Sequence, residues 1–395
     1  MDRRSFLTAG SGLAVAGAAA TVALTSKPAQ AARTAAPTVF DFGAVGDGTT
    51  DDSAAFSKAL AWAAINGGFI TVPPNTYAIA NTIRWDSTQS TGVLWGLQGQ
   101  GAVLQSKITD WRDVMALYSW HTVRYFKMTG ISIVGTGSEA HGVHIAALGQ
   151  LVFFHNFLID SISVERVGMD GIVYEGDVFE FTMSNSWFQD NKGNGCTFAQ
   201  SKNGVVSSVN VNGCYFNQNG IYGMACVNWD AQYGGPTDVR VYGGYARNNQ
   251  SHGFYFNNGM GSGAGLTQVG FENNCMSKQP GDPEGAHVYA LNQVKMRDCF
   301  GYNQGGGATY LVRGWFMNSC LLDGCAQGAD GAMGATGASR LIHIDGNSNA
   351  SVIMNNCGGG FDGAGGTGVR WQAVNCGGPS PFGDLNPVGT MSGQF

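Results

Sequence analysis

A short pattern of one glycine followed by alternating apolar positions recurs along the chain. In most copies a polar residue precedes the glycine, as in Asp170-Gly171-Ile172-Val173-Tyr174. The glycines of these copies are Gly142, Gly171, Gly195, Gly223, Gly253, Gly285 and Gly307. A recurrence every ~20–50 residues is typical of a solenoid, and alternation with a period of two predicts strands. This glycine phrase therefore predicts an all-β, single-domain, right-handed parallel β-helix in which the phrase forms one strand of each coil.

The turns between the predicted strands are rich in asparagine. Five of these residues recur at similar places in successive coils: Asn191, Asn219, Asn249, Asn274 and Asn303. Asparagines stacked at a tight turn can hydrogen-bond along the stack, so we interpret them as structural and assign them no chemistry.

A different pattern precedes the repeats. Residues 39–56 predict a short strand, a glycine-rich turn and a helix opened by Thr and Asp capping residues, and Gly67-Gly68 ends this helix. A helix here would cover the open end of a parallel coil stack, whose edge would otherwise invite aggregation. We therefore predict a short N-terminal capping α-helix within a cap at about residues 39–66.

The same stretch carries a family resemblance. Its motif consists of Asp41-Phe42-Gly43-Ala44, Gly46-Asp47-Gly48-Thr49 and Asp51-Asp52-Ser53. It resembles the N-terminal signature of the pectate-lyase-like β-helix superfamily, which includes polygalacturonases, polysaccharide lyases and phage tailspike depolymerases. The resemblance covers about residues 39–80 and implies the fold, without indicating the reaction. Asn75 stands where relatives usually have glycine, and asparagine tolerates the same left-handed turn. The downstream catalytic motifs of polygalacturonases are missing.

The two ends of the chain are predicted to be different from the coils. Arg3-Arg4 precedes an apolar run from Leu13 to Leu24, and small residues suited to cleavage follow. Residues 1–31 therefore predict a twin-arginine signal peptide, which implies a secreted or periplasmic protein with no membrane contact after cleavage. Residues 32–395 would form the β-helix, with an irregular tail at about 377–395.

Composition narrows the classes of partner. Hydrophobic residues make up 44% of the chain, which excludes a disordered protein, and charged residues make up only 12%. The net charge of −6 argues against a nucleic-acid partner and weakly disfavours a strongly polyanionic substrate. We expect a polysaccharide or oligosaccharide substrate, no cofactor and no metal, and a monomer or a homotrimer.

The cysteines are interpreted as packing residues. All nine lie between Cys196 and Cys376, without the spacing of a zinc site, and an odd number cannot pair completely. Buried small apolar side chains are favoured over disulfides.

Candidate catalytic residues come from aligning the glycine phrases, with the first and third residues after glycine facing inward. Glu175 and Asp177 are two residues apart on a predicted strand, so they are expected to share one face at about 6.5–7 Å, a separation within the range of glycosidase carboxylate pairs. Asp170 would reach the same groove from its edge. His144, one coil away, and His252 are expected to assist. The alternative is that Glu175 and Asp177 are solvated turn residues.

Candidate substrate-binding residues lie in later coils, most of them on the outward face, with Trp229 and Asp230 in a longer excursion between two strands. They are aromatic or polar side chains suited to stacking on, or hydrogen bonding with, pyranose rings: Tyr222, Trp229, Asp230, Tyr255, Asn257, His287, Tyr289 and Arg313. The alternative is an aromatic ladder that only stabilises the sheet.

These candidates predict a secreted, carbohydrate-active enzyme that cleaves glycosidic bonds within an extracellular polysaccharide, with hydrolysis by paired carboxylates as the first hypothesis. A polysaccharide lyase or epimerase is the close alternative, since His252, Tyr255 and Arg313 offer acid–base groups and a cation. A non-catalytic glycan-binding or adhesive β-helix is the alternative from another class, because fold does not imply activity.

Overall fold

The structure, a computed structural model, describes most of the chain from residue 36 onward. The described ranges are 36–87, 92–149, 152–200, 206–228, 237–257, 264–277, 285–303, 310–314, 319–329, 340–345, 351–358, 360–362, 369–376 and 390–394. The predictions for residues 1–31, for Trp229 and Asp230, and for most of 377–395 concern residues outside these ranges. Among the described residues, no helix combines the length and apolar character needed to cross a bilayer.

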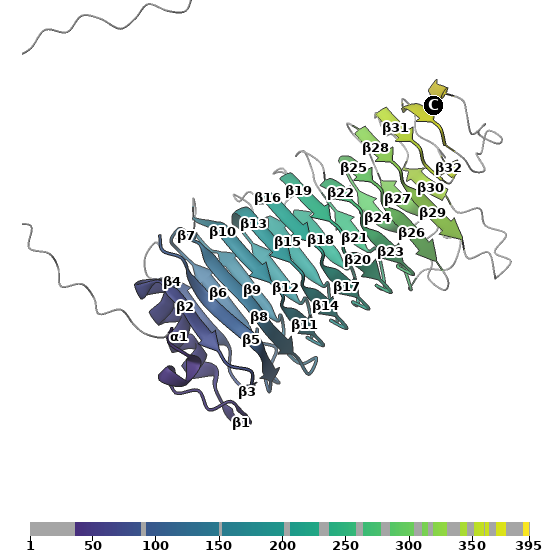
Figure 1. Ribbon diagram of the computed structural model, residues 1–395. Coiled ribbons are helices and arrows are strands. Elements are labelled where there is room, and N and C mark those ends of the chain that lie inside the picture. Colours follow the sequence, from purple (N-terminus) through teal and green to yellow (C-terminus); the bar gives the residue numbers. More distant parts are fainter. Residues whose placement is uncertain are drawn as a thin grey trace, which may run out of the picture. The chain divides into compact units, whose positions relative to one another are not determined.

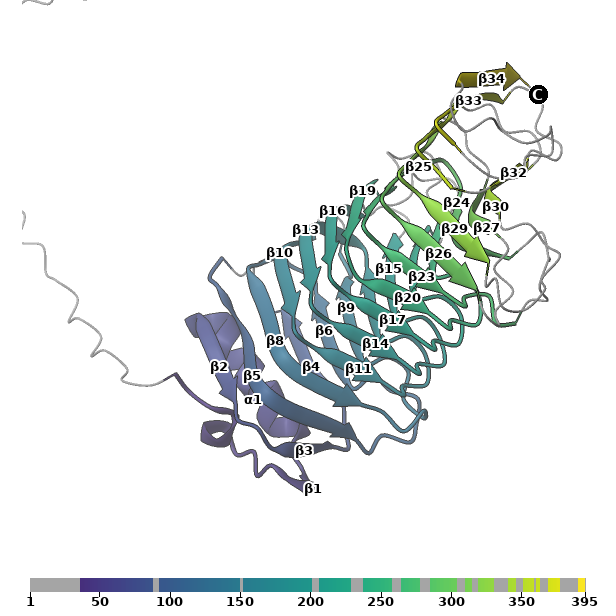
Figure 2. The same ribbon diagram turned by 45° about the vertical axis from the view of Figure 1, so that its right-hand side comes forward.

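Strands from successive coils stack in parallel and form an 11-stranded sheet and a 23-stranded sheet (Figures 1 and 2). The larger sheet is bent into two faces, which we call the second and third sheets. The first sheet has 11 strands in the described residues: β4 (Ile83–Ser87), β6 (Met115–Ser119), β9 (Val143–Ala147), β12 (Ile172–Glu175), β15 (Cys196–Gln200), β18 (Met224–Asn228), β21 (Phe254–Phe256), β24 (Ala286–Ala290), β27 (Tyr310–Gly314), β30 (Arg340–Ile344) and β32 (Gly360–Asp362). Each strand of this sheet from β9 to β24 begins directly after the glycine of one phrase, from Gly142 to Gly285.

The remaining strands make up the second and third sheets. The second sheet contains β2 (Gly68–Val72), β7 (Val123–Arg124), β10 (Phe153–Asp160), β13 (Asp177–Ser184), β16 (Val206–Asn212), β19 (Thr237–Tyr242), β22 (Ala264–Thr267), β25 (Gln293–Arg297), β28 (Ser319–Asp323), β31 (Ser351–Asn355) and β33 (Arg370–Val374). The third contains β1 (Asp47–Asp51), β3 (Thr76–Ile79), β11 (Ser163–Glu165), β14 (Trp187–Gln189), β17 (Tyr215–Asn217), β20 (Tyr245–Arg247), β23 (Gly270–Glu272), β26 (Phe300–Asn303) and β29 (Ala326–Ala329). The long strands β5 (Trp95–Ser106) and β8 (Phe126–Val134) run through both, and β34 (Thr390–Gln394) pairs antiparallel with β33.

Two helical segments lie at the N-terminal end of the described chain (Figure 1). They are the 3-10 helix η1 (Val39–Phe42) and α1 (Ser53–Asn66). From α1, the side chains of Phe56, Leu60 and Ala63 enter the hydrophobic core that the coils enclose. The helix expected from the sequence is confirmed, and its role in shielding the end of the stack stays a prediction.

The coils turn where single residues adopt the left-handed conformation. Between the second and third sheets, positive φ recurs at successive coils, for example at Asn185 (48°), Asp298 (50°) and Asn356 (51°). Asparagine, aspartate and glycine reach this conformation at the least steric cost, which explains their frequency at the turns.

The glycine of the phrase is required by close packing between coils. A Cβ at Gly171 would lie 2.5 Å from the carbonyl oxygen of Gly195, and one at Gly195 would lie 2.5 Å from that of Gly223. These distances are too short for any side chain. The phrase therefore marks a place where successive backbones approach each other too closely for a Cβ.

The asparagine turns form a buried hydrogen-bonded ladder. Asn191 Nδ2 donates to Asn219 Oδ1 at 3.1 Å, and Asn219 Nδ2 donates to Asn249 Oδ1 at 3.0 Å. Asn249 Nδ2 donates to Asn274 Oδ1 at 2.8 Å. The structural interpretation of these four residues is confirmed, whereas the side chain of Asn303 is not described.

All nine cysteines are buried and none is disulfide-bonded in the structure. Five of them follow equivalent left-handed positions, and each thiol donates to the carbonyl oxygen two residues earlier: Cys214, Cys299, Cys325, Cys357 and Cys376. The interpretation of the cysteines as buried packing residues is confirmed.

Candidate functional site

The first sheet brings polar residues from three coils together at its outer face. Strand register pairs Ala116 with His144 and His144 with Val173. One step outward along the strands, Tyr118 pairs with Ala146, and Ala146 pairs with Glu175. Because Ala116 and Ala146 are small, the longer side chains of Tyr118, His144 and Glu175 can lean toward one another across the strands.

His144 lies at the centre of this group, which we call the His144 cluster (Asp113, Tyr118, His141, His144 and Glu175). Its Nδ1 lies 3.1 Å from Asp113 Oδ2, and its Nε2 lies 3.3 Å from Glu175 Oε2. Tyr118 Oη donates to the same Asp113 oxygen at 2.9 Å and lies 3.1 Å from His144 Nδ1. The two carboxylates therefore hold opposite edges of one imidazole ring.

This arrangement sets the charges of the cluster. Burial opposes protonation of His144, but hydrogen bonds with Asp113 and Glu175 outweigh it and raise its pKa to about 9. The hydrogen bond from His144 lowers the pKa of Glu175. The pKa of Asp113 is lowered although burial opposes this, because His144 and Tyr118 donate to it. At neutral pH the cluster holds an imidazolium between two carboxylates.

The members of the cluster differ in how exposed their side chains are and in which of them carry a proton. The side chain of Asp113 is 11% exposed, and its other oxygen accepts the backbone N–H of His141 at 3.2 Å. The side chain of Glu175 is 43% exposed. Burial and the nearby Asp113 raise the pKa of Tyr118, so its phenol keeps its proton. Glu175 is thus the ionised group that a ligand can reach, and Tyr118 and His144 hold the protons.

Two further features of the cluster bear on ligands. The guanidinium carbon of Arg84 lies 5.3 Å from the centre of the Tyr118 ring, and Arg84 Nε donates to Asp86 at 2.6 Å. Asp113, His141 and His144 offer ligand atoms within 4.8 Å of one another, close enough to share a metal ion. In the structure, Asp113 and His144 instead satisfy each other by hydrogen bonding, and we assign no metal.

The predicted pairing of Glu175 with Asp177 is wrong. Glu175 ends β12 in the first sheet, whereas Asp177 begins β13 in the second sheet. Gly176 lies between them with a φ of 94°, so the chain turns a corner there. Asp177 is buried, with 6% of its surface exposed. A spacing of two residues places side chains on one face only while the strand continues.

Asp170 is held by hydrogen bonds within the turn. Its carboxylate accepts the backbone N–H of Asn194 at 2.7 Å and the hydroxyl of Thr197 at 2.6 Å. Its own N–H donates to His141 Nδ1 at 3.3 Å. The carboxylate is buried and directed at the next coil, so Asp170 supports the cluster through His141 and does not face the groove as expected.

The later coils of the first sheet carry a stacked aromatic column. The rings of Tyr222 and Tyr255 lie 4.6 Å apart at 6°, and those of Tyr255 and Tyr289 lie 5.4 Å apart at 10°. Arg313 lies over Tyr289 at 5.6 Å and pairs with Asp345 at 2.8 Å. The sequence predicted four of these side chains as one outward surface, and the structure brings them together.

His252 is part of this column and not of the His144 cluster. It is 9% exposed, and its ring stacks on Tyr289 at 5.4 Å. Its Nδ1 donates to the carbonyl oxygen of Ala286 at 2.7 Å. Three strand steps separate it from Glu175, so the expectation that it assists Glu175 is not supported by its position. Asn257 follows β21 and is half-buried.

The outward position predicted for His287 is wrong. His287 is fully buried, and Nδ1 accepts from Asn274 Nδ2 at 3.1 Å, which extends the asparagine ladder. Burial lowers its pKa to about 3, so it is neutral. Strand register explains the error, because Phe254 pairs with Val288 and His287 therefore lies at the position equivalent to Gly253, where a Cβ points at Asn274 and Phe271. The phrase at Gly285 is therefore offset by two residues from the phrase at Gly253.

Three members of the His144 region escaped the sequence analysis as functional candidates: Arg84, Asp113 and Tyr118. Val114 occupies the glycine position in its coil, since Met115 pairs with Val143. A search keyed on glycine could not place Asp113 in the same column as His141 and Asp170. The only feature of the sequence that could have marked this strand is the apolar pattern of Val114, Met115 and Leu117.

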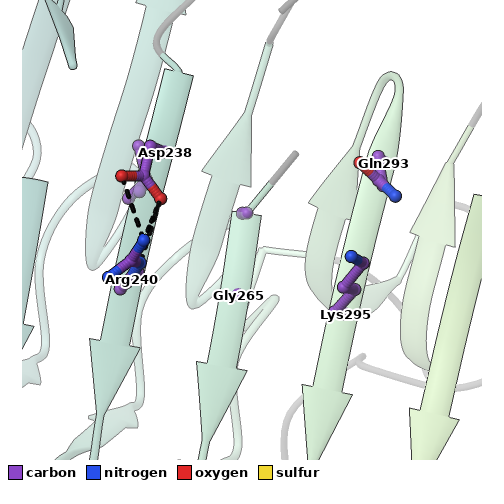
Figure 3. A pocket seen from close by; sticks show the side chains of 7 residues that line it. Asp238, Arg240, Gly265, Gln293 and Lys295 are labelled. Atoms are coloured by element: carbon purple, nitrogen blue, oxygen red, sulfur yellow. Dashed lines mark hydrogen bonds and ion pairs between the residues drawn. The ribbon is translucent and has the colours of Figure 1, made fainter. Parts of the chain in front are cut away.

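A surface hollow of about 280 Å³ lies on the outer face of the second sheet (Figure 3). Asp238 and Arg240 of β19 and Gln293 and Lys295 of β25 flank Gly265 of β22, whose missing side chain leaves the gap. Asp238 and Arg240 form an ion pair at 2.9 Å. This hollow is on a different sheet from the His144 cluster.

Residues 75–241 match the family described as "Right handed beta helix region". The chain is a right-handed parallel β-helix. The fold implied by its resemblance to the pectate-lyase-like superfamily is thereby confirmed. No curated protein sequence matches the chain significantly.

Solved structures with the same fold include viral proteins and a bacterial enzyme module. The A-module of the Azotobacter vinelandii mannuronan C-5 epimerase AlgE4 is 17% identical, with a TM-score of 0.58 over 82% of this chain and 95% of that one. The enzymatically active domain of bacteriophage CBA120 tailspike protein 2 is 13% identical, with a TM-score of 0.60 over 82% and 48%. Geobacillus virus E2 ORF18 is 14% identical, with a TM-score of 0.57 over 86% and 61%. The chain therefore spans less than two thirds of either viral protein, and at these identities the likeness is one of fold.

Proposed function

We propose that this protein is a secreted enzyme that acts on an extracellular polysaccharide and that its reaction takes place at the His144 cluster. The observation that carries the proposal is the reachable, ionised carboxylate of Glu175, held by an imidazolium beside a protonated phenol. A proton acceptor and proton donors at hydrogen-bonding distance are the requirement for general acid–base catalysis. The named activity of one similar structure, a mannuronan C-5 epimerase module, supports a glycan substrate.

The distribution of protons favours β-elimination on a uronate-containing glycan. Glu175 would take the proton from the carbon beside the uronate carboxylate, and the electron pair of that C–H bond would form the new double bond. The bond from carbon to the leaving oxygen would break, and Tyr118 or His144 would protonate that oxygen. Arg84, beside Tyr118, is the cation available to the uronate carboxylate. Epimerisation would use the same first step and return a proton to the other face of the carbon.

Hydrolysis is the second candidate, because Asp113 and Glu175 flank the same ring. A glycosidase requires one carboxyl group that keeps its proton near neutral pH, usually through a raised pKa. His144 lowers the pKa of Glu175, and the pKa of Asp113 is also lowered. In a hydrolase of this geometry, the proton for the leaving oxygen would have to come from His144 or Tyr118. We therefore rank elimination above hydrolysis.

The aromatic column supports a long substrate. In strand register, His144 and Tyr255 are separated by four strand steps, through Val173, Thr197 and Ala225. At about 4.8 Å per step, the separation is about 19 Å. A ligand that contacts both the His144 cluster and the column must therefore contain several sugar units, as an internally cleaved polysaccharide does.

A polysaccharide panel tests the proposal. The mature protein would be incubated with alginate, pectate, xylan and carboxymethyl cellulose, with and without a chelator. Products would be read for new reducing ends, for the ultraviolet absorbance of unsaturated uronates, and by NMR for epimerised residues. Unsaturated ends or epimerised uronates support the proposal, and reducing ends alone favour hydrolysis. Binding to a polymer without any of these products would favour the adhesive alternative.

A further inference from the structure

A second exposed row of aromatic side chains lies on the outer face of the third sheet. Strand register aligns Trp187, Tyr215 and Tyr245 in successive coils. Trp187 is 43% exposed and Tyr215 is 42% exposed. Their rings stack 4.6 Å apart at 15°. The pair offers a broad apolar surface on a different sheet from the His144 cluster.

A glycine opens a slot beside this pair. Tyr245 pairs in register with Gly270, and Gly270 pairs with Phe300. The ring of Tyr245 leans over Gly270, where a Cβ would lie only 2.2 Å from it, and comes within 6.2 Å of the Phe300 ring. Because Tyr245 leans away from Tyr215, a hollow of about 180 Å³ lies between them, which we call the Tyr215 slot.

Polar groups hold the slot open and line it. Tyr245 Oη donates to Glu272 at 3.0 Å, and Arg247 pairs with Glu272 at 3.3 Å, so the tilted ring is fixed. Asn217 and Arg247 line the slot together with the aromatic rings. Asn217 Oδ1 is buried and accepts no hydrogen bond from the part of the chain that the structure describes. The slot thus combines an apolar ring face with the charged donor Arg247.

We propose that the Tyr215 slot binds one pyranose unit of a polysaccharide, as a binding site separate from the His144 cluster. A pyranose ring has an apolar face of C–H groups that fits against Tyr215, and hydroxyl groups at its rim that can accept from Arg247. The slot is smaller than the ~300 Å³ at which drug-sized pockets begin, which suits one ring of a long chain. The site would keep a polymer on the protein while other segments reach the first sheet.

Binding measurements on four variants test this proposal independently of any reaction. Affinity electrophoresis would compare the mature protein with Trp187→Ala, Tyr215→Ala and Gly270→Ala in gels that contain alginate, pectate, xylan or carboxymethyl cellulose. The Gly270→Ala substitution removes no aromatic group, but its Cβ forces Tyr245 back toward Tyr215 and narrows the slot. Tyr242→Ala is the matched control, since Tyr242 is 54% exposed and ends β19 of the second sheet.

We expect the three slot variants to bind the retained polymer about tenfold more weakly and the control to bind as tightly as the parent. Circular dichroism and the thermal midpoint would establish that each variant is folded. Turnover of a short oligosaccharide substrate is expected to stay unchanged in all four. Unchanged polymer binding in the slot variants, or no binding of the parent to any polymer, would overturn the proposal. Conversion of an oligomer to a monomer by Tyr215→Ala would also overturn it, by identifying the row as a subunit interface.

Discussion

At the scale of single residues, the central feature is the charge of His144. Two carboxylates on opposite edges of its ring stabilise the imidazolium, and the ring in turn keeps Glu175 ionised. His287 shows the opposite environment in the same fold, because it is enclosed by the core and burial lowers its pKa to about 3. The surroundings of each histidine thus determine whether it acts as a cation at the surface or as a neutral packing residue.

The charge of His144 predicts how stability depends on pH. Its pKa is about 9 in the folded chain, against an ordinary value of 6.5. The resulting stabilisation, about 3 kcal/mol, is fully present below pH 6.5 and is lost as the pH rises through about 9. Chemical denaturation at a series of pH values should therefore show this decline in the parent protein. The decline should be absent in His144→Gln, and an equal decline in that variant would contradict the assignment.

His144 and Glu175 could be predicted from the sequence, whereas Asp113 and Tyr118 could not. The reason is physical, because a close approach of backbones requires a residue without a Cβ at most coils but tolerates Val114 at this one. His287 shows the reverse error, since Gly285 follows the sequence pattern without occupying the equivalent position in space. Single-residue markers identify a repeat well, yet the register of hydrogen bonds between strands decides which residues meet.

At the scale of elements, the corners of the coils carry most of the specific information. Alternation within strands predicted the inward side chains of β9 and β12 correctly. The chain direction changes at Gly176, which moves Asp177 to another sheet and separates it from Glu175. The alternation of apolar and polar residues within a strand does not show where the chain turns a corner, and Gly176 itself is the only mark of this one. The paired-carboxylate hypothesis could therefore not be checked from the sequence.

The asparagine ladder predicts a large effect from one buried side chain. Asn219 accepts from Asn191, and it donates both to Asn249 and to the carbonyl oxygen of Phe188 at 3.2 Å. The substitution Asn219→Ala leaves these buried groups without partners, so we expect the free energy of unfolding to fall by about 2–3 kcal/mol. Denaturant titration would measure this. Gln98→Ala, an exposed position in β5, should change it by less than about 0.5 kcal/mol, and equal effects would contradict a structural ladder.

At the scale of the whole molecule, the coils form a stack in which each sheet presents a different outer surface. The first sheet carries the His144 cluster and the aromatic column, the second carries the hollow around Gly265, and the third carries the Tyr215 slot. The glycine repeat and the N-terminal motif were sufficient to predict this architecture. The functions of the surfaces depend on contacts between residues that lie a full coil apart in the sequence, such as His144 with Glu175 and Tyr255 with Tyr289, and the sequence alone does not determine those contacts.

The continuous core predicts that the cysteines do not react in the folded protein. All nine are buried, so a reagent in solution does not reach their sulfur atoms, and at Cys214 burial also raises the pKa of the thiol to about 12. We expect a thiol reagent to label none of them in the native protein and all nine in denaturant without a reductant. Fewer labelled thiols in denaturant would reveal disulfides, and rapid native labelling would contradict the buried stack.

The central claim is that Glu175 is the proton acceptor of a polysaccharide-acting site. The most direct test is the initial rate of unsaturated-uronate formation by Glu175→Gln and by Glu180→Gln, a control that changes an exposed carboxylate on β13. General acid–base catalysis typically contributes ~10²–10⁴-fold to a rate, so we predict that Glu175→Gln is slower by at least about 100-fold. The control should match the parent protein. Parental activity in Glu175→Gln would contradict this account.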